Sequence, residues 1–338
     1  MKMPTLSVCV ATHERPELLK RTLDGLARQL RLPDEIIVSD SSSFRASEAV
    51  VRSFAEVWPN LRLKYVRSDR KALPWQRWWA FKHSSGETVL LLDDDVQLAP
   101  PALQILEDAW RTLMGFNCQP IAGVGFRMSW EDGEMLTRNR KAFTERWLGT
   151  SNVQSGTVTT GGLSVSLDDL RSDSPVRVDQ LWGGAMSFSR QVLQSIGPLD
   201  RLAALYDKGV GRGEDVVLSY YARKHGSLYL VTQPVALHPR YGVTAKGAPY
   251  ASDGWYLGLT ATWGRAHTLR WMATDWSAYK LAWLRIATLE LARCIAGIVR
   301  RPLQPSRWKR LGGACYGIVK TISGWNRIPF AAGPLKSR

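Results

Sequence analysis

The chain has 338 residues, of which 45% are hydrophobic, and a formal net charge of +15. This length and hydrophobic content exclude an intrinsically disordered protein and suffice for one large domain or two smaller ones. The four cysteines lie far apart, without the spacing of a metal site or a disulfide framework. We therefore expect a reducing, cytoplasmic compartment.

The positive charge is concentrated near the C-terminus. Residues 265–338 carry 14 Lys/Arg and 2 Asp/Glu, a net of +12, which leaves +3 for residues 1–264. Neither an apolar run long enough to span a bilayer nor the apolar core of a secretion signal occurs, so no spanning helix is expected. The charge asymmetry indicates a separate function for the basic tail.

The first hundred residues alternate between short apolar runs and segments with helical spacing. We expect strands at 6–11, 35–39, 63–66 and 88–92, separated by helices at 17–30, 46–57 and 75–84. This order predicts an α/β fold with parallel strands joined by right-handed crossovers. Ligands of such sheets bind beyond the carboxyl ends of the strands, where Thr12, Asp40 and residues 93–95 fall. We expect these positions to converge in space.

Three adjacent aspartates, Asp93, Asp94 and Asp95, follow the fourth predicted strand. Their charges repel one another, so the segment is either a solvated acidic turn or the binding site of a cation. Mg²⁺ and Mn²⁺ prefer oxygen ligands and often share them with phosphates. Convergence with the other strand ends favours a divalent cation bound together with a phosphorylated ligand.

Several segments, in this order, resemble family 2 glycosyltransferases, which have the nucleotide-sugar-binding GT-A fold. They are VCVATHERPELLKRTLDGLARQ, PDEIIVSDSS, SSGETVLLLDDDV, WGGAMSFSRQVLQSIGPLD and GRGEDVVLSYYARKHG. The resemblance covers about residues 5–240. It implies a nucleotide-sugar-binding half at 1–100, an acceptor-binding and catalytic-base half at 101–264, and a basic, Trp-containing helical tail at 265–338. Within the second half, we expect 120–180 to be an irregular insertion that lines the acceptor side.

The resemblance also implies roles for donor-binding residues. Thr12 and Arg15 would lie beside the nucleotide, and Asp40 would hold the base or the ribose. Asp40 could instead form an Asx-turn in the segment DSSS.

Arg77 matches a basic residue that lies near the diphosphate in the family. Here the sequence departs from the family pattern, because Trp75, Trp78 and Trp79 replace the usual small residues and Asn. These tryptophans either pack against the sheet or stack on a sugar or base.

Asp93 and Asp95 match the outer positions of the family's DXD motif. By the resemblance, Asp95 is the metal ligand, Asp93 contacts the ribose or the metal through water, and Asp94 belongs to the donor-binding set. His238 follows a predicted strand at 227–237, where related folds place a third ligand for Mn²⁺ or Mg²⁺. A single histidine is also commonly structural.

Glu214 and Asp215 form a second acidic site, which follows glycines at 209, 211 and 213 and opens an apolar helix at 216–222. The pair could simply cap that helix, since a helix N-terminus favours carboxylates. By the family pattern Asp215 is the general base that deprotonates the acceptor hydroxyl, and Glu214 binds or orients the acceptor. A single base opposite the leaving group implies direct displacement with inversion.

The tail contains an amphipathic helix at 279–299, followed by an apolar stretch at 312–325. One stripe of the helix holds Leu281, Leu284, Thr288, Leu291, Ile295 and Ile298. Basic amphipathic helices with tryptophans bind membrane interfaces. Packing on the catalytic domain and oligomer formation are the competing interpretations.

Together these features predict a metal-dependent, inverting glycosyltransferase that moves one sugar from a nucleotide-diphospho-sugar to a glycan or lipid-linked acceptor. Processive synthases of the family carry several spanning helices and a Gln-x-x-Arg-Trp motif after the base, and we expect neither here. A nucleotidyltransferase is a second candidate, although a Gly-rich phosphate loop does not follow the first strand. A nucleic-acid-binding protein would explain the net charge, but the body carries acidic clusters at its site, so no nucleic acid is expected.

Overall fold

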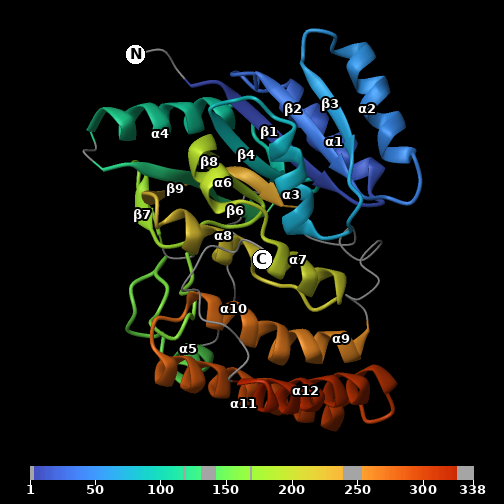
Figure 1. The fold of residues 1–338 in the computed structure, drawn as a ribbon, viewed down its shortest axis with the longest axis vertical. Coiled ribbons are helices and arrows are strands. Elements are labelled where there is room, and N and C mark those ends of the chain that lie inside the picture. Colours follow the sequence, from blue (N-terminus) through green and yellow to red (C-terminus); the bar gives the residue numbers. More distant parts are fainter. Residues whose placement is uncertain (1–3, 117–118, 131–141, 168–169, 239–252, 326–338) are drawn as a thin grey trace.

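A computed structural model describes residues 4–116, 119–130, 142–167, 170–238 and 253–325 of the chain. A nine-stranded mixed sheet forms the centre of the molecule, in the order β3-β2-β1-β4-β8-β6-β9-β5, with β7 paired to β9. Helices flank the sheet, and a separate layer of helices near the C-terminus lies below it in Figure 1. The predicted α/β class and helical C-terminal extension are both confirmed.

The first half of the sheet is parallel, as the sequence predicts. Its strands are β1 (Leu6–Thr12), β2 (Glu35–Asp40), β3 (Leu63–Arg67) and β4 (Thr88–Asp93), and its helices are α1 (Pro16–Ala27), α2 (Ala46–Val57) and α3 (Leu73–Lys82). Every residue of β1 and β2 is buried, because helices cover both faces of a parallel sheet. In the strand register Thr12 lies beside Asp40 and Ala11 beside Asp93. The polar residues that end these strands therefore share one edge.

The second half of the sheet mixes strand directions, because β8 runs antiparallel to both β4 and β6. Its elements are β5 (Gln97–Leu98), α4 (Ala102–Phe116), β6 (Ile121–Trp130), α5 (Ala142–Leu148), β7 (Val176–Val178), β8 (Ala185–Ser189), α6 (Arg190–Ile196), α7 (Asp200–Asp207), α8 (Glu214–Ala222) and β9 (Ser227–His238). The expectation of an irregular insertion at 120–180 is wrong for its first part, since β6 is a buried strand between β8 and β9. Residues 131–141 and 168–169 of that insertion lie outside the described residues.

The C-terminal layer consists of α9 (Gly254–Leu259), π-helix η1 (Thr260–Gly264), α10 (Arg265–Met272), α11 (Trp276–Arg300) and α12 (Pro305–Ser323). The elements α9, η1 and α10 follow one another without a break, so the expected domain boundary at 265 falls inside a helical segment. A second hydrophobic core joins this layer to α5. It includes Leu148, Leu163, Ala266, Leu269, Tyr279, Ala282 and Trp283.

Glycines let α12 approach α9 closely. A Cβ at Gly258 would lie 2.1 Å from the Arg310 carbonyl oxygen, and one at Gly313 would lie 2.0 Å from the Trp255 carbonyl oxygen. The buried carboxylate of Glu290 on α11 pairs with Arg310 on α12 at 2.6 Å. These contacts make α12 an integral part of the layer rather than a loose extension.

Over the described part of the chain, no helix combines the length and the apolar character that crossing a bilayer requires.

Candidate functional site

The acidic triplet lies where β4 ends, at the edge of the sheet that also carries Thr12 and Asp40. Asp94 is 1% exposed and points inward. Its Oδ2 accepts a hydrogen bond from Thr12 Oγ1 at 2.6 Å, and its Oδ1 lies 3.3 Å from Arg15 Nη2. The structure thus brings Thr12, Arg15 and Asp94 together. A solvated acidic turn is excluded for Asp94.

Burial raises the pKa of Asp94 to about 7; the charges of Asp95 and Asp93 add to this shift, while Arg15 and Thr12 oppose it. Burial likewise raises the pKa of Asp93, with Arg77 opposing the shift and Asp95 adding to it. These shifts mean that the described side chains do not fully compensate the negative charge of the triplet.

Asp95 lies between a cation and a histidine. Arg15 Nη1 donates to Asp95 Oδ2 at 3.0 Å, and His238 Nε2, at the end of β9, lies 3.9 Å from Asp95 Oδ1. The structure therefore brings two of the three predicted metal ligands to one place. The third, Asp93, is drawn toward Arg77 instead, at 2.6 Å.

The side chains gathered here are of the types that bind a divalent cation. Carboxylate and imidazole groups suit Mn²⁺ and Mg²⁺, and Asp94 Oδ1 is buried without a hydrogen bond from the described residues. No three His, Cys, Asp or Glu side chains within the described ranges are grouped closely enough to hold an ion by themselves. A cation here would share its coordination with phosphate oxygens, as Mg²⁺ often does.

Arg77 connects the triplet to the second acidic site. Its guanidinium, 3% exposed, donates from Nη2 to Asp93 Oδ1 at 2.6 Å and to the Gly183 carbonyl at 2.7 Å. Nη1 lies 3.2 Å from Glu214 Oε1. Burial alone would lower the pKa of Arg77, but Asp93 and Glu214 outweigh it and raise the pKa above its usual value. Arg77 is permanently charged and joins the end of β4 to the loop before β8 and to the start of α8.

Glu214 and Asp215 open α8 after Gly213, whose φ of 73° places it in the left-handed region that glycine tolerates. Both Glu214 oxygens are engaged, Oε1 by Arg77 and Oε2 by a short hydrogen bond from the Tyr206 hydroxyl. Asp215 Oδ1 accepts from the Val216 backbone N–H at 2.9 Å, which also supports the first turn of the helix. In this structure Glu214 contacts protein groups rather than presenting a free oxygen to an acceptor.

Asp40 is fully buried and its carboxylate is satisfied locally. Oδ1 accepts from the Ser42 backbone N–H at 2.8 Å, the contact that defines an Asx-turn, and Oδ2 accepts from Tyr65 Oη at 2.7 Å. This favours the turn-forming interpretation of Asp40. A direct contact with a nucleotide would have to displace Tyr65.

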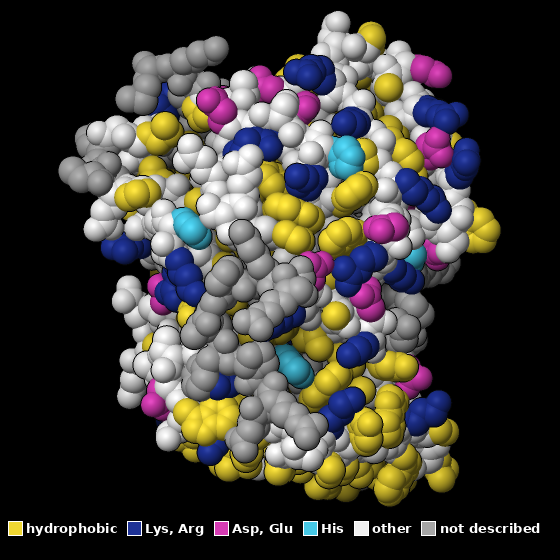
Figure 2. All heavy atoms as spheres, viewed as in Figure 1, with side chains coloured by type: hydrophobic (Ala, Val, Ile, Leu, Met, Phe, Trp, Pro, Cys, Tyr) yellow, Lys and Arg dark blue, Asp and Glu magenta, His cyan; other side chains and the backbone are white. Residues whose placement is uncertain are grey.

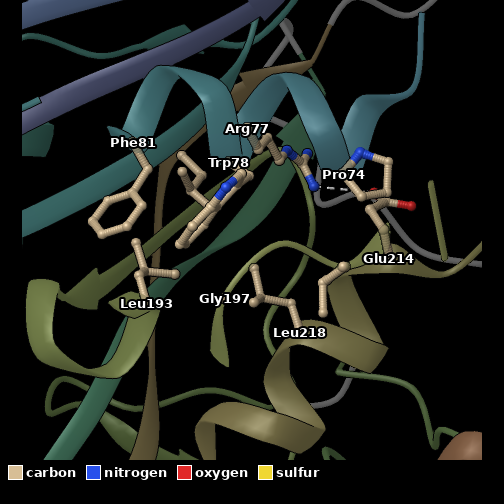
Figure 3. A pocket seen from close by; sticks show the side chains of 10 residues that line it. Pro74, Arg77, Trp78, Phe81, Leu193, Gly197, Glu214 and Leu218 are labelled. Atoms are coloured by element: carbon tan, nitrogen blue, oxygen red, sulfur yellow. Dashed lines mark hydrogen bonds and ion pairs between the residues drawn. The ribbon is translucent and has the colours of Figure 1, made fainter. Parts of the chain in front are cut away.

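The tryptophans of α3 pack within the protein. Trp75 stacks on Trp79 with ring centroids 6.2 Å apart, and Trp78 lies 5.1 Å from Phe81. Trp78 also lines a small pocket between α3, α6 and α8, with Phe81 and Leu193 at one end and Pro74 and Glu214 at the other (Figure 3). Trp78 and Trp79 pack against the hydrophobic core, whereas the half-buried Trp75 contacts Trp79 and the guanidinium of Arg70.

Two residues of the site, Tyr206 and Tyr65, carry no recognisable sequence signal, and a third, Gly183, lies in the segment WGGAMSFS without a role assigned from the sequence. Tyr206 and Tyr65 each donate to a predicted acidic residue, and Gly183 accepts from Arg77. A Cβ at Gly183 would lie 3.1 Å from Glu214 Oε1, so the glycine allows the β7–β8 connection to approach α8. Tyr65 and Gly183 have partners that are distant in sequence, and the contact of Tyr206 with Glu214 depends on how α7 packs. A single sequence reveals neither.

The expectation about the Gln-x-x-Arg-Trp motif needs correction. Residues 304–308, Gln-Pro-Ser-Arg-Trp, match the Gln-x-x-Arg-Trp pattern that was not expected here. The structure places this segment at the start of α12, where Arg307 Nε donates to Gln304 Oε1 at 3.2 Å and Trp308 is 54% exposed. The expectation that this motif would not occur after the proposed base is therefore wrong.

The N-terminal part of the chain matches a known protein family. Residues 7–156 match the model of glycosyl transferase family 2, which includes β1 to β4, Arg77 and the triplet. A validoxylamine A glucosyltransferase from Streptomyces hygroscopicus subsp. limoneus is 46% identical over 66 residues, 19% of this chain and 14% of that protein. The O-antigen biosynthesis protein RfbC from Myxococcus xanthus is 31% identical over 102 residues, 29% of this chain and 8% of that protein.

A mannosyltransferase from Pyrobaculum calidifontis, PcManGT, solved with GDP-Man and Mn²⁺, aligns with 97% of this chain and 84% of its own at a TM-score of 0.49 and 19% identity. The chain spans less than a sixth of the length of the curated relatives named above. Glu214, Asp215 and His238 lie beyond the family match. The match, together with a parallel half-sheet that ends in the acidic triplet, agrees with the predicted GT-A class and identifies residues 7–156 as a glycosyl transferase family 2 domain.

Proposed function

We propose that this protein transfers one sugar from a nucleotide-diphospho-sugar to a hydroxyl of a glycan or lipid-linked acceptor, with inversion at the anomeric carbon. The family assignment favours this transfer over nucleotidyl transfer or nucleic-acid binding. The observation that carries the proposal is the bridge made by Arg77, which joins the triplet at the end of β4 to the acidic pair at the start of α8. Donor and acceptor chemistry would therefore meet at one place.

On the donor side, Thr12 holds Asp94 in place and Arg15 orients Asp94 and Asp95. Arg15 is about a third exposed, so its guanidinium can also reach a diphosphate. Asp95 and His238 would hold a divalent cation, which would offset the charge that develops on the leaving nucleoside diphosphate. Arg77 would add a fixed positive charge beside the same phosphates.

On the acceptor side, Asp215 would take the proton of the attacking hydroxyl. It is only partly buried and lies in the first turn of α8, next to Glu214 and the Arg77 bridge. Glu214, bound by Arg77 and Tyr206, would position Asp215 and the helix start rather than contact the acceptor itself. With a single base and no second nucleophile proposed, displacement is direct and inverts the anomeric carbon.

Thermal shift tests the donor half of the proposal. Nucleoside diphosphates should raise the unfolding temperature of the wild type only when Mn²⁺ or Mg²⁺ is present. Asp95→Asn should abolish this metal-dependent shift. Asp108→Asn, a substitution of an exposed aspartate on α4, should keep it. A shift of equal size in Asp95→Asn, or one that needs no metal, would contradict the assigned cation site.

Product analysis tests the acceptor half. Slow release of nucleoside diphosphate from UDP-, GDP- or dTDP-sugars identifies the donor, and NMR of the product reports the configuration of the new linkage. Asp215→Asn should lower turnover at least about 100-fold with little effect on donor affinity, since a general base contributes mainly to the chemical step. A retained configuration would exclude direct displacement.

The expected location, cytoplasmic and peripheral to the inner face of a membrane, remains part of this proposal.

A further inference from the structure

The two outermost helices of the C-terminal layer present large hydrophobic side chains to solvent. On α11 these are Leu281, Leu284, Ile295 and Val299, exposed by 48%, 51%, 56% and 74%. On α12 they include Trp308, Val319 and Ile322, exposed by 54%, 65% and 52%, and Leu303 between the helices is 94% exposed. Hydrophobic side chains gather at the lower edge of the molecule in Figure 2, where Figure 1 shows α11 and α12. We call these eight residues the α11–α12 face.

The α11–α12 face is not the side of α11 that is buried in the hydrophobic core. Helix α11 buries Tyr279, Trp283 and Ala287 against the rest of the layer, and the exposed stripe lies on the other side of the same helix. The stripe predicted from the sequence therefore exists, but much of it points outward. A surface helix of a globular protein normally buries one apolar face and exposes a polar one. An apolar surface of this extent indicates an interaction site.

The charge around the face is of one sign. Residues 276–325 contain nine Lys/Arg and a single acidic residue, Glu290. Glu290 is 3% exposed and is paired with Arg310, so it does not offset the charge at the surface. Arg293, Arg300, Arg301 and Lys309 are all exposed. The surface thus combines apolar side chains with uncompensated positive charge.

We propose that the α11–α12 face binds the surface of an anionic lipid bilayer. The apolar side chains would enter the boundary between headgroups and acyl chains, while the surrounding Lys and Arg side chains contact anionic headgroups. A second copy of the chain would bring like charges together, and a nucleic acid would leave the aliphatic side chains without a partner. Charge complementarity and apolar character together fit an anionic membrane.

This docking would set the position of the catalytic site relative to the bilayer. Helices α11 and α12 lie on the side of the layer away from the sheet, and α10 packs between α11 and α8 (Figure 1). The start of α8, with Glu214 and Asp215, would be held above the membrane by the thickness of this layer. The lipid-binding inference itself does not depend on the proposed transferase activity.

Vesicle flotation of the full chain tests the inference. The wild type should float with phosphatidylcholine vesicles that contain about 30 mol% phosphatidylserine and not with pure phosphatidylcholine, and binding should weaken as salt rises. Replacement of Leu281, Leu284, Ile295 and Val299 by serine should weaken binding at least about tenfold. The matched control replaces four exposed hydrophobic residues of the parallel half, Leu30, Leu32, Phe44 and Val57, by serine and should bind like the wild type.

A charge series separates the two contributions. Arg293→Ser, Arg300→Ser and Lys309→Ser together should remove most of the dependence on phosphatidylserine. Arg28→Ser, Arg45→Ser and Arg62→Ser, which change the net charge equally at exposed positions elsewhere, should not. Thermal unfolding of each variant confirms that it is folded.

The fluorescence of a dye attached at a single position tests whether the α11–α12 face itself contacts the bilayer. A Leu303→Cys variant, in a Cys118→Ser and Cys315→Ser background and labelled with an environment-sensitive dye, should shift to the blue with anionic vesicles, whereas a label at Phe44→Cys should not. Equal flotation of the apolar and control variants, or no flotation of the wild type, would overturn the inference. Dimers lost in the apolar variant would assign the face to a second copy, and retention of a labelled RNA or DNA without flotation would assign it to nucleic acid.

Discussion

The guanidinium of Arg77 lies 3.2 Å from the carboxylate of Glu214, although 137 residues separate them in the chain. The same guanidinium donates to Asp93. One buried cation thus connects the end of β4 to the start of α8, and with them the two acidic groups that the proposed reaction requires.

Replacing Arg77 by methionine should destabilise the protein by about 3 kcal/mol, because Asp93 and Glu214 would remain in a buried place without their cation. Urea unfolding measures the change. The double variant Arg77→Met/Glu214→Gln should recover part of the loss, since one of the stranded charges is gone. If the double variant is no more stable than the single one, Glu214 does not depend on Arg77 for its charge compensation.

Thr12→Val should lower stability by about 1–2 kcal/mol and weaken nucleoside diphosphate binding, because the buried Asp94 loses its hydrogen-bond donor. Thr12→Ser keeps a hydroxyl at the same place and should behave like the wild type. Denaturant unfolding and calorimetric titration with metal present provide the two measurements. If Thr12→Val is as stable as Thr12→Ser, the hydroxyl of Thr12 does not stabilise the Asp94 carboxylate.

Gly258→Ala and Gly313→Ala should each loosen the docking of α12, since the added methyl group would overlap a backbone carbonyl of the partner helix. We expect a lower unfolding temperature and faster proteolysis within 305–323. Gly115→Ala on α4 is the control, because nothing lies within 4 Å of its Cβ position. That variant should be neutral or slightly stabilised, as alanine is the better helix former. Unchanged proteolysis of the first two variants would mean that the helices can move apart at little cost.

Acid should destabilise the C-terminal layer through His267. Burial, with the charges of Lys208 and Lys320 adding to it, lowers the pKa of His267 to about 4. The unfolded chain, with a histidine pKa near 6.5, then binds more protons than the folded one between these values. The contribution of neutral His267 is complete above about pH 6.5 and is lost as the pH falls toward 4, on the order of 3 kcal/mol.

The unfolding free energy should therefore fall less steeply between pH 6.5 and 4 in His267→Gln than in the wild type. His225→Gln, which replaces an exposed histidine, should keep the wild-type slope. Denaturant unfolding at several pH values measures the slopes. Parallel curves for all three proteins would rule out the predicted titration of His267.

The sequence predicts the parallel half well because its signals are local. Apolar runs bounded by Pro and Gly mark β1 to β4, and the aspartates at the end of β4 follow directly. It fails at β6, where Gly123, Gly125 and Arg127 interrupt the apolar run. These three residues are explained by contacts with segments that are distant in sequence. A Cβ at Gly123 would lie 2.6 Å from the Ser187 carbonyl oxygen, and the buried Arg127 donates to the Leu170 carbonyl.

The candidate site divides in the same way. Residue types and order identify Thr12, the triplet and the pair Glu214–Asp215, because these follow strands or open a helix. Arg15 and Arg77 come from the family resemblance, since Arg77 lies inside α3. Which carboxylate each arginine meets depends on how β4, α3 and α8 pack, and no local pattern records that. Tyr206 and Tyr65 are missed for this reason, and the engagement of both Glu214 oxygens is seen only in the folded chain.

By itself the sequence determined the alternation of strands and helices, the acidic positions at their ends and the basic, apolar composition of the tail, because periodicity and charge are properties of neighbouring residues. Only the tertiary structure decided that Arg77 joins two acidic groups and that one apolar side of α11 is buried while the other faces solvent. The physical reason is that pairing and burial depend on which surfaces meet when distant segments pack. Helical spacing alone does not distinguish the apolar side of α11 that is buried from the one that faces solvent.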